Sequence, residues 1–140
     1  MKLLFIHPSF PSQYRPLAEY YAADPANQVV GLGEGGHLRV NYQVPGSRLV
    51  GYQTPEPPGR ETYFLAQDFE AAARRAMQAA GALKALKESG CEPDLILIHP
   101  DWGEGLLLKA YYPDTPLLAY AEFYHAARAE VRPLYTTHRA

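Results

Sequence analysis

Hydrophobic residues occur along the chain in two arrangements, short continuous runs and longer stripes with helical spacing. The runs are not interrupted by alternating polar residues, a pattern typical of strands buried on both faces of a parallel sheet. We therefore predict strands at residues 3–6, 28–32, 48–52, 94–99 and 115–120.

Helices are predicted between these runs. After the first run, Leu17, Tyr20 and Tyr21 recur at helical spacing, with Pro16 in the first turn, where proline is tolerated. A long helix is predicted at 64–89 and a shorter one at 102–111. The stripe of the long helix consists of Leu65, Phe69, Ala72, Ala73, Ala76, Ala80, Leu83 and Leu86.

Strands that alternate with helices predict an α/β fold. Right-handed crossovers would make it a doubly wound, mainly parallel Rossmann-like sheet flanked by helices. Residues 33–46 show no clear period, and residues 53–60 hold three prolines, so both are expected to be irregular. A chain of 140 residues has the usual size of one domain.

Composition and charge argue against several classes of protein, including nucleic-acid-binding and membrane proteins. The net charge of −2 carries no basic bias, so no nucleic-acid partner is expected. His7 and Pro8 interrupt the first apolar run too early for a signal peptide or a membrane helix, so membrane association is not expected. The single cysteine, Cys91, cannot form an intramolecular disulfide and is expected to be inert, which fits a cytoplasmic protein.

Two histidines mark the candidate site. The predicted strands at 3–6 and 94–99 both end in the dipeptide His-Pro, which gives His7 and His99. In open α/β sheets ligands bind beyond the carboxyl ends of the strands, where the strand order reverses, and these two strands would normally flank that point. An imidazole there can contact sugar hydroxyls or phosphate; alternatively, each histidine only caps its strand by bonding to the backbone.

The start of the predicted helix at 102–111 is a second candidate, because unpaired N–H groups at a helix start favour an anion. Trp102 could stack on a sugar ring or pack into the core. Asp101 and Glu104 could instead form a capping box, which we favour for Asp101. Beyond the last predicted strand, Glu122 and Tyr124 could contact an acceptor, or Glu122 could form a salt bridge or a cap.

Two other motifs do not meet their structural requirements. The glycines at 31–36 follow the second strand, but no clear helix is predicted after them, so they do not form a dinucleotide-binding fingerprint. The five histidines show no spacing typical of a metal site. We expect no metal and no resident cofactor.

Four segments together resemble the N-terminal domain of a bacterial subgroup of family-4-type glycosyltransferases. The most specific parts are the HPxWGExLxLK pattern at 99–109 and the EFYY-like run at 122–125. The resemblance extends from residue 1 to about 131. The four segments are residues 1–18, 63–76, 93–109 and 116–131.

The resemblance implies a two-lobed, retaining enzyme that needs no bound metal. The N-terminal lobe would mostly hold the acceptor, and the C-terminal lobe the nucleotide-sugar donor. His99 matches a histidine that lies next to the transferred sugar, and so it is the predicted catalytic residue. The loop after the first strand would approach the donor phosphates, although Ser12 stands where such loops often carry glycine. The predicted substrate-binding residues are His7, Phe10, Ser12, Gln13, Trp102, Gly103, Glu104, Glu122 and Tyr124.

We therefore expect residues 1–140 to be the acceptor-side domain of a glycosyltransferase, with the donor lobe absent and little activity alone. Its partners would be a saccharide or other acceptor and the missing C-terminal lobe. The alternative is a stand-alone saccharide- or protein-binding module that docks with a separate lobe or forms a homo-oligomer. A small nucleotide or flavin binder is disfavoured, because no glycine- or hydroxyl-rich phosphate loop follows the first strand.

Overall fold

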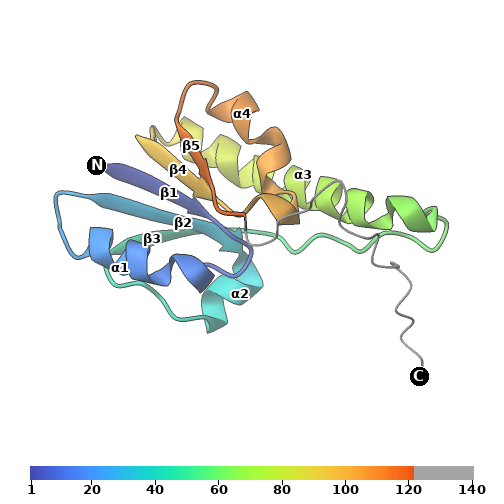
Figure 1. Cartoon of the computed structure of the whole chain (residues 1–140), viewed down its shortest axis with the longest axis horizontal. Coiled ribbons are helices and arrows are strands. Elements are labelled where there is room, and N and C mark those ends of the chain that lie inside the picture. The colour runs from blue at the N-terminus through green and yellow to red at the C-terminus, as the bar shows by residue number, and fades with distance from the viewer. Residues whose placement is uncertain (122–140) are drawn as a thin grey trace.

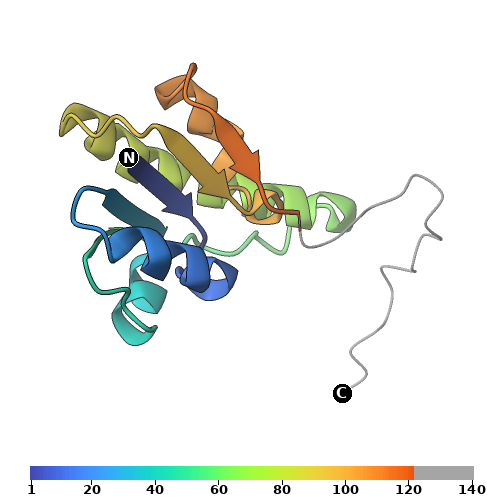
Figure 2. The ribbon, with the colours of Figure 1, turned by 60° about the vertical axis from the view of Figure 1, so that its left-hand side comes forward.

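The computed structural model describes residues 1–121, which form one five-stranded sheet (Figure 1). All four strand pairings are parallel, and the spatial order is β3-β2-β1-β4-β5. Figure 2 shows the strand arrows pointing the same way. The strands are β1 (Lys2–Ile6), β2 (Gln28–Glu34), β3 (Ser47–Tyr52), β4 (Leu95–Ile98) and β5 (Leu117–Ala119).

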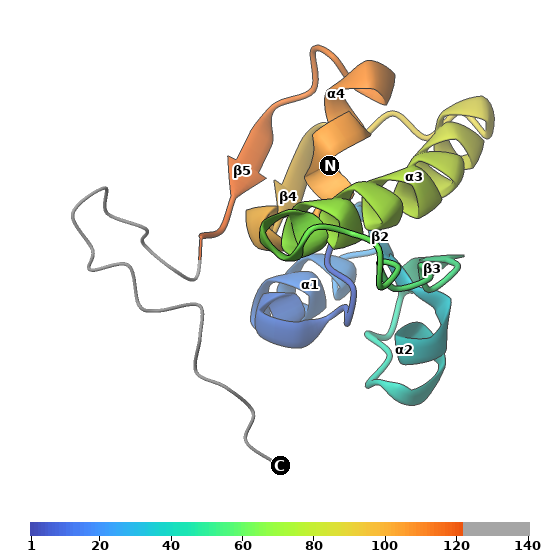
Figure 3. The ribbon, with the colours of Figure 1, turned by 90° about the vertical axis from the view of Figure 1, so that its right-hand side faces the viewer.

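The helices cover both faces of this sheet, with α1 and α2 on one face and α3 and α4 on the other (Figure 3). Short 3₁₀ turns precede or replace parts of the helices at Ser12–Tyr14, Phe64–Ala66, Pro100–Trp102 and Glu104–Leu107. The helices are α1 (Arg15–Ala22), α2 (Gly35–Val40), α3 (Gln67–Glu88) and α4 (Leu108–Tyr111). The predicted doubly wound, Rossmann-like class is confirmed.

Alternation along the strands builds a core on each face. Leu3 and Phe5 of β1 point to the α1 and α2 side, whereas Leu4 and Ile6 point to the α3 and α4 side. All four are at most 1% exposed, so β1 is buried on both faces, as its continuous apolar run predicts.

The sequence missed helix α2. Residues 33–46 were expected to be irregular, but Gly35–Val40 form a short helix. Its two leading glycines have low helix propensity, and six residues show little periodicity. Packing against the core stabilises this helix in place of intrinsic propensity, since Leu38 is 5% exposed and belongs to the core shared with α1.

The predicted apolar stripe of α3 is buried only in part. A helix of 22 residues is about 33 Å long, whereas strands of three to seven residues span about 10–23 Å. The N-terminal end of α3 therefore runs past the carboxyl ends of the strands (Figure 1). Leu83 is fully buried, but Phe69 is 69% exposed and Leu65, in the preceding turn, is 59% exposed.

The helix predicted at 102–111 is wrong in its first half. Residues 100–107 form two 3₁₀ turns separated by Gly103, which adopts a left-handed φ of 104°, and only Leu108–Tyr111 are α-helical. This break removes the helix N-terminus that was expected to favour an anion.

Smaller differences from the predictions concern the last strand and helix α1. The last strand is limited to Leu117–Ala119, and on α1 the buried residue is Ala18 while Tyr20 is 74% exposed. No helix within residues 1–121 is long and apolar enough to cross a membrane.

Candidate functional site

The strand-end histidines meet where the strand order reverses. The chain runs outward from β1 through β2 to β3, then returns to place β4 on the other side of β1. Ile6 and Ile98 pair in register, so His7 and His99 leave the sheet side by side. Their ring centroids are 5.7 Å apart at an interplanar angle of 79°. The predicted juxtaposition of the two histidines is therefore present.

These histidines belong to a row of five aromatic rings along the carboxyl edge of the sheet. The order is Tyr120, Tyr14, His7, His99 and Trp102, with successive centroid distances of 6.2, 6.4, 5.7 and 6.0 Å. The three inner residues are at most 7% exposed, whereas Tyr120 is 51% and Trp102 is 43% exposed. We call this set the ring row.

Backbone N–H groups fix the orientation of both imidazoles. His7 Nδ1 accepts a hydrogen bond from the Ser9 N–H at 3.0 Å, and His99 Nδ1 accepts one from the Asp101 N–H at 3.4 Å. In the neutral ring the proton must then lie on Nε2, which becomes the donor. Each histidine thus bonds to the backbone after its strand, as the structural interpretation of these residues predicts.

Tyr14 is a site residue that the sequence analysis missed. Its hydroxyl is buried and has no hydrogen-bond partner within the described residues. Burial, with a smaller contribution from Tyr120, raises the pKa of Tyr14 to about 12, so the hydroxyl remains protonated. A buried O–H without a partner is costly, and a polar ligand atom could satisfy it. Its place just before α1 was visible in the sequence, but its direction was not.

The loop after β1 carries Phe10, Ser12 and Gln13, and it packs against the sheet beside the ring row. Phe10 is 1% exposed and packs on Phe5, with ring centroids 5.9 Å apart. Ser12 has a left-handed φ of 41°, a conformation that glycine adopts more readily, and its hydroxyl donates to Gln13 Oε1 at 2.7 Å. Phe10 therefore shapes the loop through packing, whereas Ser12 is exposed and Gln13 is half-buried.

The glycines after the second strand make room for that loop. A Cβ at Gly31 would overlap the Phe10 ring, and one at Gly33 would press on the backbone oxygens of His7 and Pro8. Although helix α2 does follow these glycines, which corrects the sequence expectation, their close contacts are with protein. Packing accounts for Gly31 and Gly33 without a dinucleotide.

A polar network missed by the sequence analysis lies behind Trp102. Arg75 of α3 donates from Nη2 to Glu34 Oε1 at 2.9 Å and from Nη1 to the Trp102 carbonyl at 3.2 Å. The other oxygen of Glu34 accepts from Thr54 Oγ1 at 3.0 Å. Arg75 is separated from Trp102 by 27 residues and from Glu34 by 41, so no local pattern could have revealed this network.

Glu104 is held by a tyrosine, which overturns the expected capping box. Its carboxylate accepts from the Tyr52 hydroxyl at 2.6 Å, and the residue is 1% exposed. Asp101 does not cap this segment, because the side chain of His99 accepts its N–H. Burial raises the pKa of the Glu104 carboxyl, and burial together with Glu104 raises the pKa of Tyr52.

The remaining predicted residues are Gly103, Glu122 and Tyr124. A Cβ at Gly103 would overlap the backbone of Ala72 in α3, so the loop after β4 lies directly on that helix. Glu122 and Tyr124 lie outside the described residues. Within residues 1–121, no three His, Cys, Asp or Glu side chains gather as metal ligands would.

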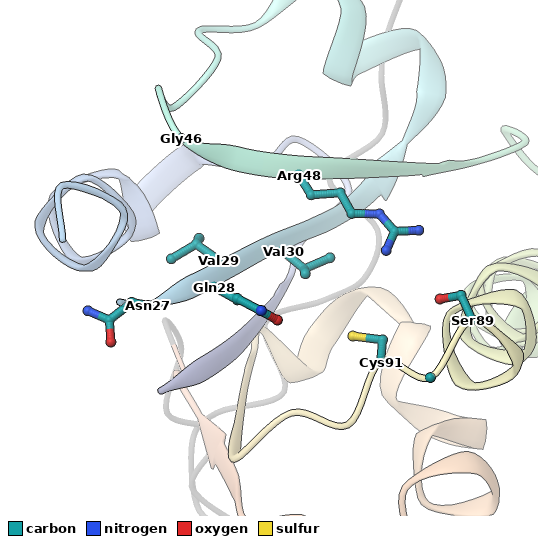
Figure 4. Close-up of a pocket in the computed structure, with 9 residues that line it drawn as sticks. Asn27, Gln28, Val29, Val30, Gly46, Arg48, Ser89 and Cys91 are labelled. Carbon is teal, nitrogen blue, oxygen red and sulfur yellow. The ribbon is translucent and has the colours of Figure 1, made fainter. Parts of the chain in front are cut away.

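A cavity of about 330 Å³ lies at the opposite, amino edge of the sheet (Figure 4). Residues from the starts of β2 and β3 and from the segment after α3 surround it, including Arg48, Ser89 and Cys91. Burial raises the pKa of the Cys91 thiol, which supports the expectation of an inert cysteine. Because ligands of open α/β sheets bind at the carboxyl edge, we place the candidate site at the ring row.

Comparisons with known proteins agree with this architecture. The model of a family described as the glycosyl transferase family 4 group matches residues 25–132. A variant of Os79 from O. sativa, solved in complex with UDP, is similar at a TM-score of 0.55 and 15% identity. The match covers 85% of this chain and 28% of the Os79 chain, and at this identity it shows the fold alone.

A second solved structure, the C-terminal domain of a hydrogenase from Pyrococcus furiosus, has a TM-score of 0.48 and 16% identity. That match covers 84% of this chain and 89% of the hydrogenase domain, and it says nothing about function. No curated protein matches the sequence.

Proposed function

The chain belongs to the glycosyl transferase family 4 group, and we propose that it is the acceptor-binding domain of a glycosyltransferase. The reaction would transfer a sugar from a nucleotide-sugar donor to a saccharide or other acceptor. A second lobe would bind the donor, and the transfer would proceed with retention. The chain spans 28% of Os79, the solved protein that supports the fold, so the activity of a whole enzyme remains part of this proposal.

The observation that carries the proposal is the ring row. Aromatic rings offer apolar faces on which the C–H groups of a sugar can stack, and Trp102 and Tyr120 expose such faces at the two ends. Between these ends, the buried hydroxyl of Tyr14 is a donor that has no partner among residues 1–121. Stacking surfaces that flank such a donor suit a polyhydroxylated ring.

Within this site His99 takes the role next to the transferred sugar, between His7 and Trp102 in the row. Binding assays test its contribution. We expect His99→Ala to weaken saccharide binding about tenfold or more, the effect of losing a buried hydrogen bond and leaving its ligand partner unpaired. His37→Ala is the matched control, because His37 is half exposed on α2 and lies outside the row. Equal affinity of His99→Ala and the parent chain would contradict the role of His99.

The isolated chain should bind without completing the reaction. Transfer requires the donor and acceptor to be held together with water excluded, which one wall of a site does not achieve. We expect no multiple-turnover transfer from nucleotide sugars to saccharides by the purified chain. Sustained transfer would contradict the proposal of an acceptor-side domain.

A second candidate function is association with a separate lobe or with another copy of the chain. Apolar side chains just before and at the start of α3 favour it, since Tyr63, Leu65 and Phe69 are each more than half exposed. Light scattering across a range of concentrations tests self-association, with Phe69→Ser as the disrupting variant. A monomer at every concentration would leave a separate lobe as the partner for this surface.

A further inference from the structure

Arg75 occupies the centre of a polar brace that spans the carboxyl edge of the sheet. We use brace for Glu34, Tyr52, Arg75 and Glu104 together with the Trp102 carbonyl. Two N–H groups of Arg75, from Nη2 at 2.9 Å and Nε at 3.3 Å, reach one oxygen of Glu34, while Nη1 reaches the carbonyl at 3.2 Å. The Tyr52–Glu104 bond holds the residue two positions beyond Trp102.

The brace connects parts of the sheet that do not touch one another. Glu34 ends β2 and Tyr52 ends β3, and both strands lie on the far side of β1 from β4. The loop that carries Trp102 follows β4. Arg75 reaches both sides because α3 packs across the sheet face between them. Residues at the ends of β2 and β3 therefore hold the loop that follows β4, on the other side of β1.

The bonds between Arg75 and Glu34 are partly shielded from water, whereas the bond to the Trp102 carbonyl is exposed. The side chain of Glu34 is 5% exposed and that of Arg75 is 21% exposed. Charge-assisted hydrogen bonds are stronger in such surroundings than at an open surface. Gly103 adds a second constraint, because the loop lies directly against Ala72 at that point. The backbone at the Trp102 carbonyl and at the following Gly103 is thus held against α3.

We propose that Arg75 is a positioning residue that holds the Trp102 indole beside His99 and thereby sets the affinity of the ring row for saccharides. The second half of this statement rests on the proposed function. Arg75 itself need not contact the ligand: it acts through the Trp102 carbonyl, and Glu34 acts by orienting the guanidinium.

The single tryptophan of the chain gives a direct test. Fluorescence emission and acrylamide quenching of Trp102 would be compared among the parent chain, Arg75→Gln, Arg75→Lys and Glu34→Gln. Arg74→Gln is the matched control, because Arg74 adjoins Arg75 on the same helix but pairs with Glu70. We expect a red shift and about twofold faster quenching in the Arg75 variants, a smaller change in Glu34→Gln, and no change in the control.

Saccharide titrations of the same variants test the second half. We expect affinity to fall about fivefold to tenfold in Arg75→Gln, the order expected for losing a charge-assisted bond. Unchanged emission and quenching would overturn the proposal even if the melting temperature falls, because the brace would then only stabilise the fold. If Arg75→Gln does not fold, Arg75→Lys, which keeps the charge but loses the guanidinium fork, is judged by the same criterion.

The two proposals can fail separately. If Trp102 becomes more accessible in the variants but the parent chain binds no saccharide, the proposed function fails and the positioning by Arg75 stands. If accessibility changes while saccharide affinity does not, the link between Arg75 and affinity is wrong.

Discussion

Several residues of the candidate site also form hydrogen bonds that stabilise the local backbone. His7 and His99 each accept a backbone N–H, and the same bond determines which ring nitrogen carries the proton. Structural and functional interpretations of these histidines are therefore compatible. Trp102 shows the same combination, since its carbonyl is held by Arg75 while its ring is 43% exposed.

Gly103 should tolerate no side chain. Its left-handed φ of 104° disfavours other residues, and a Cβ would overlap the backbone of Ala72. We expect Gly103→Ala to lower the free energy of unfolding by about 2–4 kcal/mol, measured by urea denaturation.

Gly81 provides the opposite case within α3. A Cβ at Gly81 meets no atom within 4 Å, and alanine is the better helix former. Gly81→Ala should therefore raise the free energy of unfolding by about 0.5–1 kcal/mol. Equal effects of the two substitutions would contradict the contact between the Trp102 loop and α3.

Glu104 should make stability depend on pH. Burial raises the pKa of its carboxyl, so the folded protein binds this proton more tightly than the unfolded chain does. The contribution of Glu104 is full below the unfolded pKa of about 4.3 and is lost as pH rises through the folded pKa. The difference in unfolding free energy between the parent chain and Glu104→Gln should therefore fall from pH 4 to pH 8. A constant difference would contradict the raised pKa.

At the scale of elements, sequence patterns predicted the strands and the long helix, because these elements show a regular local pattern of apolar residues. The strands were found because buried parallel strands give continuous apolar runs, and α3 was found because its stripe persists over many turns. Helix α2 and the turns around Gly103 were missed, because contacts with β3 and α3 determine them. The histidine pair followed from topology, whereas Arg75 and Tyr14 depend on side-chain directions that the sequence does not specify.

Helix α3 and the turn that precedes it should respond differently to substitution. Leu83 is fully buried against the sheet, whereas Leu65, in the turn that leads into the helix, is 59% exposed beyond the sheet's edge. Leu83→Ala should lower the free energy of unfolding by about 2–5 kcal/mol, and Leu65→Ala should change it by less than about 0.5 kcal/mol. Thermal and urea denaturation measure both, and a large loss in Leu65→Ala would show that this segment is packed.

At the scale of the whole molecule, the sheet separates a carboxyl edge, where the candidate site lies, from an amino edge. The carboxyl edge carries the ring row, the brace and the overhanging start of α3, while the amino edge carries the cavity beside Cys91. Membership in the glycosyl transferase family 4 group agrees with a role of this domain in glycosyl transfer. The proposed function requires saccharides to bind at the carboxyl edge through the ring row.

Backbone and side-chain NMR shifts during titration with a panel of saccharides test that claim most directly. We expect saturable shift changes concentrated on His7, Tyr14, His99, Trp102 and Tyr120, with the residues around Cys91 unaffected. Changes centred on the amino-edge cavity, or no saturable change with any saccharide while the chain is folded, would contradict it.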